Sequence, residues 1–422
     1  MVTQRREDQR IDAVIDEVFA DDAVFRQRGW SRTFESLDEP ADYLFALPDD
    51  EPDPEEVFRQ LRFGGQFVLV ADRRSPIRRM AKRIGDDHGF VVEHEDAVEV
   101  GKTLGVLPKK VHYLVARRTE LILPGEISHH FTFDVRLTRN DQSPTGWAVL
   151  KQLPSPSRVF KHLKDKYPNV DDEKLGKSTR QLVDKVFPVL LTREVAFLKL
   201  LQRDLPRNWR SRVPNIYEYE QGPDNYVDSM QMNWLRQGGR KMTQIEFARD
   251  AAQLMHLVHE RAKIIHLDMR LDNILITDEG VCLIDFGSAV RRGEAFRDTS
   301  LLKTIFNELM STSGVQKVMG RLIDAGQITS TELIRNHRKM NPAADLFYLT
   351  LQLKHLHKHP DYRGLIEYDP ESEEAARVEK LAQEVLRPKN PKQPTITAAR
   401  DLLERVEKIE MEISEELITL DD

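Results

Sequence analysis

Three short polar signals lie close together in residues 264–290. A His-Leu-Asp tripeptide ends at Asp268, Asn273 follows five positions later, and an Asp-Phe-Gly tripeptide begins at Asp285. Two apolar runs, NILI and VCLI, lie between Asn273 and Asp285, and a turn rich in Asp and Gly separates them. Such a pattern predicts a β-hairpin. The hairpin would bring the Asn273 amide and the Asp285 carboxylate to one site.

This set of side chains suits phosphoryl transfer. That reaction needs a carboxylate that orients or deprotonates the attacking hydroxyl, and oxygen ligands that hold Mg²⁺ on the nucleotide phosphates. Asp268 fits the first role. Asn273 and Asp285 fit the second, because Mg²⁺ prefers hard oxygen ligands and takes only one or two of them from protein. The alternative is an ordinary buried hairpin with acidic residues that meet by chance.

Residues 264–290 resemble the catalytic loop and the metal-binding segment of the eukaryotic-type protein kinase family. The resemblance implies an α+β, bilobal protein kinase-like fold, with a β-rich N-lobe and a helical C-lobe, and it implies ATP and Mg²⁺ as cofactors. It also implies that Phe286 and Gly287 line the cofactor site. Arg270 lies two positions after Asp268, where Ser/Thr kinases carry a lysine that neutralises the transferred phosphate, and arginine keeps that charge.

A second part of the resemblance lies upstream. Lys151 ends the run Ala-Val-Leu-Lys, which resembles the V-A-I-K strand of the family, and the resemblance implies that Lys151 contacts the α- and β-phosphates. The family pairs this lysine with a glutamate on the next helix. Glu194 is the candidate, because it is the only acidic residue between Asp184 and Asp204 in a stretch with helical periodicity. The alternative for Glu194 is a surface residue that pairs with its neighbours.

The chain departs from the family pattern in two places. The phosphate loop has one glycine, Gly125, in the sequence GEISHH, so we expect a stiffer backbone there, with Gly125 and Ser128 as the residues that contact phosphate. No Ala-Pro-Glu tripeptide follows Gly287, and residues 299–339 read as helices instead. The next helix resembles the one whose buried aspartate supports the catalytic loop, which implies that role for Asp345.

Two further patterns concern the helix before the catalytic loop. Thr243 and Glu246 have the spacing of a capping box, which predicts the start of a helix that runs to about residue 263. His256 and His259 lie three positions apart on it, but no third ligand completes a metal motif, so we expect packing or capping roles. The preceding sequence LRQGG, residues 235–239, reads as a flexible link after a lobe-connecting strand at 229–233.

Composition limits the class of protein. The chain has 422 residues, a net charge of −7 and 40% hydrophobic residues, so it can form sizeable cores and shows no overall basic character that would suit nucleic acid. The only cysteine, Cys282, lies in an apolar run, where an inert thiol in a reducing compartment is expected. No run is long and apolar enough to span a membrane. We expect a cytoplasmic protein.

The N-terminal part has a different pattern. Residues 54–118 read as helix, Gly64-Gly65 turn, strand, helix and two strands, and they resemble the last third of a class I S-adenosylmethionine-dependent methyltransferase. No glycine-rich cofactor loop precedes them, so a non-catalytic module is expected. The expected domains are an N-terminal α/β module (1–114), a kinase-like domain (115–400) and an acidic C-terminal helix (401–422).

The sequence therefore favours an ATP-dependent phosphotransferase, and most of all a protein Ser/Thr kinase. The missing Ala-Pro-Glu keeps open a small-molecule or lipid kinase. The single glycine of the phosphate loop keeps open a nucleotide-binding pseudokinase that acts as a regulatory module. The expected partners are ATP and a hydroxyl acceptor, either protein or small molecule. Methyl transfer is disfavoured because the cofactor loop is missing.

Overall fold

The computed structural model describes residues 11, 14–15, 18–19, 31–32, 41–47, 52–84, 88–100, 109–120, 133–238, 240–292, 342–353, 356–359, 362, 364–386 and 398–420. It divides into two compact units, Met1–Leu150 and Lys151–Asp422. Strands dominate the first unit and helices the second, so the expected mixed α+β, kinase-like fold is confirmed. Within the described ranges, no helix combines the length and apolar character that a membrane crossing requires.

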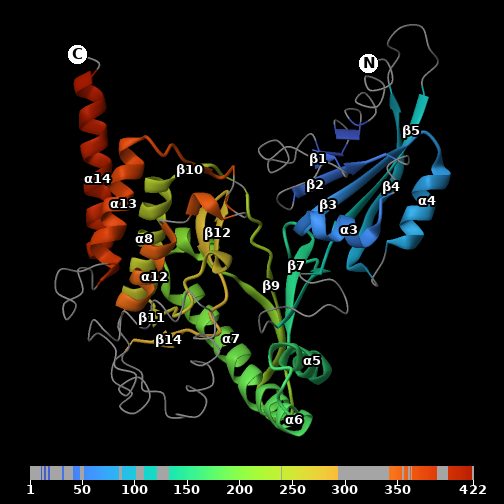
Figure 1. The fold of residues 1–422 in the computed structure, drawn as a ribbon, viewed down its shortest axis with the longest axis horizontal. Coiled ribbons are helices and arrows are strands. Elements are labelled where there is room, and N and C mark those ends of the chain that lie inside the picture. Colours follow the sequence, from blue (N-terminus) through green and yellow to red (C-terminus); the bar gives the residue numbers. More distant parts are fainter. Residues whose placement is uncertain are drawn as a thin grey trace. The chain divides into compact units, whose positions relative to one another are not determined.

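The first unit is built on a five-stranded sheet in the order β1-β2-β3-β5-β4 (Figure 1). The first three strands run parallel, and β5 is antiparallel to both of its neighbours. The strands are β1 (Ser31–Arg32), β2 (Ala41–Ala46), β3 (Leu61–Ala71), β4 (Phe90–Val100) and β5 (Lys109–Arg118). The expected helices are present as α3 (Pro54–Gln60) and α4 (Arg74–Arg83).

Strand β3 is buried on both of its faces. Phe67 and Leu69 pack into one cluster with residues of α3 and α4, while Val68 and Val70 pack into a second cluster on the other side. This alternation follows from the two-residue period of a strand. A continuous apolar run therefore marks a strand at the centre of the sheet, covered on each side.

The expected Gly64-Gly65 turn is wrong. Both glycines lie inside β3, which begins at Leu61, and the pairing with β2 shifts register between Ala41 and Tyr43. Gly64 has φ of 79°, a value that side-chain-bearing residues rarely adopt. The pair thus makes an irregularity within the strand, and this feature depends on the neighbouring strand that the local sequence does not reveal.

A four-stranded sheet has the order β6-β7-β9-β8. Its strands are β6 (Asp134–Arg139), β7 (Trp147–Gln152), β8 (Ile216–Gln221) and β9 (Val227–Asn233). Before this sheet, the structure describes Thr119 and Glu120, and Glu120 forms an isolated bridge to Arg136. The expected phosphate loop, with Gly125 and Ser128, lies outside the described residues.

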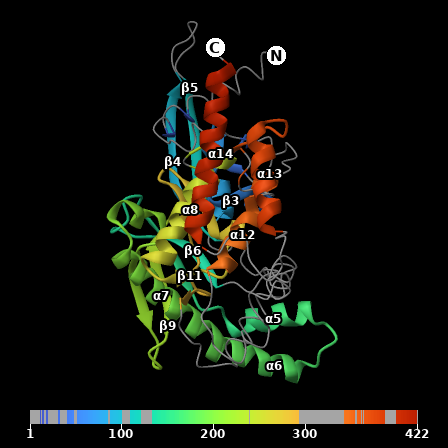
Figure 2. The same cartoon turned by 90° about the vertical axis from the view of Figure 1, so that its left-hand side faces the viewer.

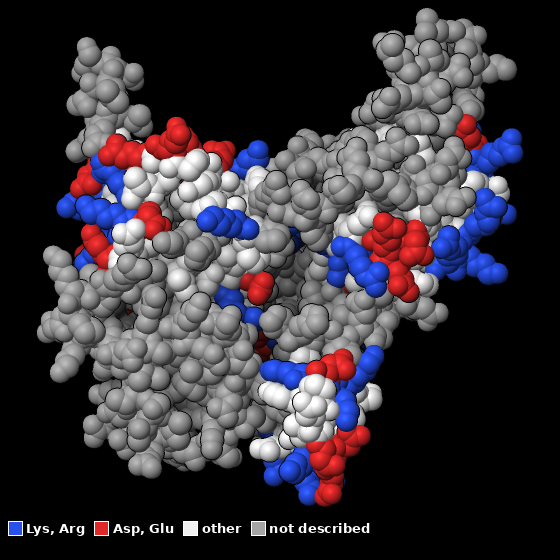
Figure 3. All heavy atoms as spheres, viewed as in Figure 1, with Lys and Arg blue, Asp and Glu red and all other residues white. Residues whose placement is uncertain are grey.

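The polar stretch after β7 is helical. It forms α5 (Pro156–Lys166) and α6 (Asp172–Gln181), which continues through a π-helical turn at Leu182–Val186 into α7 (Phe187–Asp204). Pro188, which has no N–H to donate, lies directly after the π-helical turn, at the point where α7 begins. Side chains of both charges alternate over α5 and α6, as expected for a solvated surface (Figure 3).

Helix α8 (Gln244–Glu260) begins at the expected capping box, in which the Thr243 side chain and the Glu246 side chain each bond the other's backbone N–H. It lies beside α13 (Glu373–Leu386) and α14 (Ala399–Leu420), as both ribbon views show (Figures 1 and 2). Arg249 of α8 pairs with Glu410 of α14. Short strands β10 (Met242–Thr243) and β15 (Ile366–Glu367) pair close to the start of α8.

The expected hairpin is present. Strands β12 (Ile274–Thr277) and β13 (Gly280–Leu283) pair antiparallel, and Thr277 faces Gly280 across the turn. Before them lie β11 (Ile264–Ile265) and a 3₁₀ turn (Leu271–Asn273). After them comes β14 (Val290–Arg291), which pairs with β11, and further along the chain α12 (Ala343–Leu353). The helices expected at 299–339 lie outside the described residues.

Candidate active site

The loop that carries Asp268 is held by Asp345 from α12. The two oxygens of the Asp345 carboxylate accept the backbone N–H groups of His266 and Leu267, each at 2.7 Å, and one also contacts His259 Nε2 at 2.9 Å. Leu267 has φ of 64°, which is unfavourable for leucine. Asp345 therefore stabilises a loop conformation that the local sequence disfavours. The expected support of the catalytic loop by Asp345 is therefore present as two hydrogen bonds to the loop backbone.

Asp268 is a buried carboxylate with two donors of its own. Its Oδ1 accepts Arg270 Nε at 3.0 Å, and its Oδ2 accepts Asn273 Nδ2 at 2.9 Å. Only 10% of its side chain is exposed. Burial raises the pKa of Asp268 above its ordinary value, although the positive charge of Arg270 acts in the opposite direction. The result is an oriented carboxylate with increased proton affinity.

Lys151 lies between two carboxylates. Its Nζ is 2.7 Å from Glu194 Oε2 and 3.0 Å from Asp285 Oδ1. Burial by itself lowers the pKa of Lys151, but the negative charges of Asp285 and Glu194 raise it above the ordinary value, so the ammonium stays charged. The expected contact between Lys151 and Glu194 is thus present, and the surface alternative for Glu194 is wrong because this residue is fully buried.

Glu194 has an unusual electrostatic environment. Burial raises the pKa of its carboxyl to about 7; the charge of Lys151 lowers this pKa, while that of Asp285 raises it. Its position comes from α7, whose apolar residues Leu191, Val195 and Leu198 are buried around it. The helix therefore places a carboxylate in an apolar setting, where its charge is stabilised mainly by Lys151.

Asp285 begins the segment after the hairpin with φ of 60°, an uncommon conformation for aspartate. Burial alone raises its pKa, but Lys151 holds that pKa below the ordinary value. Gly287 N donates to Asp285 Oδ1 at 3.4 Å. The Phe286 ring is fully buried and meets His266 edge-on, with 4.6 Å between ring centroids, so this side chain packs under the loop.

The hairpin brings suitable magnesium ligands to its open end. Ile284 N donates to Asn273 O at 3.0 Å, so the hydrogen-bond ladder continues one pair beyond the strands, up to the residue before Asp285. Asn273 bonds Asp268 through its amide nitrogen, and the Asp285 bonds to Lys151 and Gly287 use Oδ1. These bonds leave Asn273 Oδ1 and Asp285 Oδ2 as hard oxygen donors, which fits Mg²⁺.

Other metal sites find no support among the described residues. No group of three or more His, Cys, Asp or Glu side chains there could hold a metal ion. His259, for which a packing or capping role was expected, contacts the Asp345 carboxylate. Cys282 is buried, and burial raises the pKa of its thiol to about 11, so it stays protonated at neutral pH.

One residue near the site was not expected from the sequence. Tyr348 lies one turn after Asp345 on α12 and is buried, and its hydroxyl has no hydrogen-bond partner among the residues that the structure describes. Burial, and then the charge of Asp268, raise the pKa of Tyr348. In the sequence, only its position three residues after Asp345 on a helix could have placed Tyr348 near the site. An ordinary aromatic residue of the core could have the same spacing.

Comparison with known families agrees with this geometry. Residues 141–311 match the family model of the RIO domain, an atypical protein kinase-like family. The matched stretch contains Lys151, Glu194, Asp268, Asn273 and Asp285. A RIO domain implies a kinase-like, ATP-binding phosphotransferase. No curated protein matches the chain. The methyltransferase likeness of residues 54–118 stays a prediction, because the match does not extend to them.

Proposed function

We propose that this protein is an ATP-dependent phosphotransferase, and specifically a protein Ser/Thr kinase that moves the γ-phosphate of ATP to a hydroxyl. One observation carries the proposal. A single cation, Lys151, contacts both Glu194 and Asp285, at 2.7 and 3.0 Å, and Asp285 ends the same hairpin that begins at Asn273, the residue bonded to Asp268. The groups that phosphoryl transfer needs therefore occupy one connected site.

Asp268 acts on the acceptor. Its carboxylate binds the acceptor hydroxyl and receives the proton as the hydroxyl attacks. Asn273 holds Oδ2 in place, and Arg270 holds Oδ1 while placing a positive charge near the transferred phosphate. The raised pKa of Asp268 helps this role, because a carboxylate with higher proton affinity is a better base.

Lys151 acts on the nucleotide. Its ammonium contacts the α- and β-phosphates, and Glu194 keeps it pointed into the site. Asn273 Oδ1 and the Asp285 carboxylate would hold Mg²⁺, which when bound supplies charge that neutralises the phosphate oxygens. The contacts of Gly125, Ser128, Phe286 and Gly287 with the nucleotide are part of the proposal on the sequence resemblance alone.

Two alternatives follow from particular sequence features. A small-molecule or lipid kinase is favoured by the lack of Ala-Pro-Glu after Gly287, because that motif belongs to the platform that presents protein substrates. A pseudokinase that binds nucleotide without turnover is favoured by the single glycine of the phosphate loop. Asp268 and Asp285, both present and oriented, favour turnover.

The remaining features of the proposal concern the rest of the chain. We take residues 1–114 as a non-catalytic module, 115–400 as the kinase-like domain and 401–422 as an acidic helix. A hydroxyl-bearing protein is the proposed acceptor, with no nucleic acid among the partners. The buried, protonated Cys282 and the lack of any second cysteine suit a cytoplasmic location.

Incubation with γ-labelled ATP and Mg²⁺ tests this function. The protein is assayed alone, with a cell lysate, and with a lipid and small-molecule extract, and Asp285→Asn serves as the inactive control. Label on phosphoserine or phosphothreonine in the first two reactions supports a protein kinase. Label that appears only in the extract identifies the small-molecule alternative, and tight ATP binding without any transfer identifies the pseudokinase.

A further inference from the structure

The hairpin that carries the proposed magnesium ligands is held at the end opposite to those ligands. Its pair Ile276–Val281 lies next to the turn, and in this register the N–H and C=O groups of both residues point away from the partner strand. Among the described strands, neither residue is paired with a third strand. Each edge of the hairpin thus presents a donor and an acceptor that need partners.

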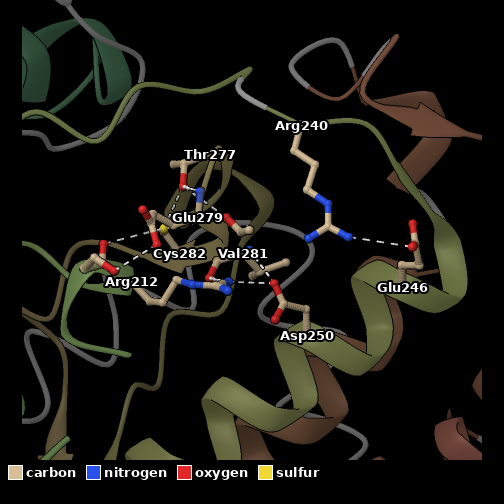
Figure 4. Close-up of polar contacts among 10 residues, drawn as sticks. Arg212, Arg240, Glu246, Asp250, Thr277, Glu279, Val281 and Cys282 are labelled. Atoms are coloured by element: carbon tan, nitrogen blue, oxygen red, sulfur yellow. Dashed lines mark hydrogen bonds and ion pairs between the residues drawn. The ribbon is translucent and has the colours of Figure 1, made fainter. Parts of the chain in front are cut away.

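On the β13 edge these partners are an ion pair. Asp250 of α8 accepts Val281 N at 2.7 Å through Oδ2, and the same oxygen accepts Arg212 Nη1 at 2.6 Å. Arg212 Nη1 also donates to Val281 O at 3.2 Å. Both side chains are mostly buried, with 13 and 14% exposed. Figure 4 shows the two side chains meeting beside the turn that carries Thr277 and Glu279.

The glycine of the turn is explained by this ion pair. Gly280 has φ of 105°, and a Cβ added to it would overlap Arg212 Nη1 and Asp250 Oδ2. The positive φ strains any side chain at this position, and the ion pair would have to move to admit a Cβ, so both features favour glycine. The sequence pattern alone assigned Gly280 only to a turn.

The β12 edge is held by the segment that follows β9. Gln237 Oε1 accepts Ile276 N at 2.6 Å, and Gly238 N donates to Ile276 O at 2.8 Å. This segment was expected to be a flexible link, and that expectation is wrong for these two residues. The pair Ile276–Val281 is therefore bonded on both edges, by side chains and backbone from three other elements.

We infer that Arg212 and Asp250 are positioning residues for the magnesium ligands Asn273 and Asp285. The inference rests on the proposed function, because it takes these two residues as the metal ligands. The hairpin between them is short: only two residue pairs separate the held pair Ile276–Val281 from the open end, where Ile284 N bonds Asn273 O. A hairpin with a fixed turn end has less freedom to twist or splay at its open end. The ion pair thereby sets the separation of the two ligands without touching the metal.

Two variants of Asp250 test this inference in the full-length protein. Asp250→Ala removes both contacts, and Asp250→Asn keeps an oxygen for Val281 N but loses the charge that pairs with Arg212. Arg249→Ala is the matched control, because Arg249 is the adjacent residue of α8 and forms its ion pair with Glu410 of α14. If Asp250→Ala fails to fold, Asp250→Asn supplies the result.

Two readouts decide the outcome. Amide hydrogen exchange should quicken at Val281 and also at Ile284, which reports the open end of the hairpin. Calorimetry of ADP binding at a series of Mg²⁺ concentrations should show a requirement for about tenfold more Mg²⁺, equivalent to about 1.4 kcal/mol. Arg249→Ala should leave both readouts at their wild-type values.

The inference is overturned if Val281 exchanges faster while Ile284 or the Mg²⁺ requirement stays unchanged, because the ion pair would then hold only the turn. A different result concerns the wild-type protein: its ADP binding could be independent of the Mg²⁺ concentration. It would contradict the magnesium assignment of the proposed function. Exchange at Ile284 would still show whether Arg212 and Asp250 order the open end.

Discussion

At the scale of single residues, the site depends on buried charges that are each paired. Lys151, Glu194 and Asp285 place two negative charges around one positive charge, and Asp268 has Arg270 and Asn273 as donors. Buried unpaired charges are strongly unfavourable, so each of these groups depends on the others for its position. The sequence motifs predicted the residue types, but the sharing of Lys151 by two carboxylates became apparent only from the geometry.

Asp268 has a raised pKa, which predicts the acid side of the pH–rate profile. The carboxylate must be ionised to accept a proton, so kcat should fall as the pH drops through the raised pKa, above the ordinary value of 3.8. Arg270 lowers this pKa, so Arg270→Gln should move the acid limb to higher pH. Steady-state kinetics between pH 4 and 8 provides the measurement, with Arg249→Ala as the control. If the acid limb of the pH–rate profile of Arg270→Gln stays in place or moves to lower pH, Asp268 is not the titrating base.

At the scale of elements, the sequence predicted those features that depend on contacts between residues close together in the chain. The capping box of α8 and the β12–β13 hairpin are present as predicted, because side chains within a few residues determine both. The Gly64 irregularity and the Gln237–Ile276 bond were not predicted. Each depends on a contact with an element distant in sequence, and local periodicity contains no information about such contacts.

Helix α12 provides a stability prediction through Tyr348. Its buried hydroxyl has no hydrogen-bond partner in the described part of the chain, and leaving such a group unpaired costs about 1–3 kcal/mol of desolvation. Tyr348→Phe should therefore raise the urea midpoint of unfolding without changing the slope m. Tyr362→Phe is the matched control: its hydroxyl donates to Leu271 O at 3.0 Å, so the midpoint should fall. A lower midpoint for Tyr348→Phe would mean that its hydroxyl has a partner in solution.

At the scale of the whole molecule, the chain combines two units of different character. The RIO match covers residues 141–311, while all five strands of the β1-β2-β3-β5-β4 sheet lie before them, between Ser31 and Arg118. The fold class was predicted from the resemblance of the motifs around Lys151, Asp268 and Asp285 to the protein kinase family, and the mixed α+β architecture agrees with it. The phosphate loop with Gly125 and Ser128, and the segment at 293–341, remain predictions from sequence because they lie outside the described residues.

The first unit should not bind S-adenosylmethionine. Its strand–helix–strand arrangement has no preceding glycine loop through which backbone N–H groups could approach the cofactor. Calorimetry with the full-length protein should show no heat of binding up to millimolar ligand, and ATP with Mg²⁺ serves as the positive control. Micromolar affinity for S-adenosylmethionine would mean that residues 54–118 belong to a working methyltransferase site.

Activity should not depend on phosphorylation after Gly287. Many kinases carry an arginine between the histidine and aspartate of the catalytic loop, and this arginine receives an activating phosphate. This chain has Leu267 there, which has no donor and no charge. Phosphatase-treated protein and a Thr299→Ala/Ser300→Ala variant should retain most of their activity. A tenfold loss, about 1.4 kcal/mol, that rephosphorylation reverses would contradict this view.

The central claim is that Asp268 and Asp285 perform separate tasks in one phosphotransferase site. The most direct test compares γ-phosphate transfer and Mg²⁺-dependent ATP affinity in Asp268→Asn and Asp285→Asn. Asp268→Asn should lower transfer by about 10²–10⁴-fold with ATP affinity nearly unchanged, because this residue serves the acceptor. Asp285→Asn should abolish transfer and weaken ATP binding, because a charged metal ligand is lost. Wild-type transfer rates in both variants would contradict the account.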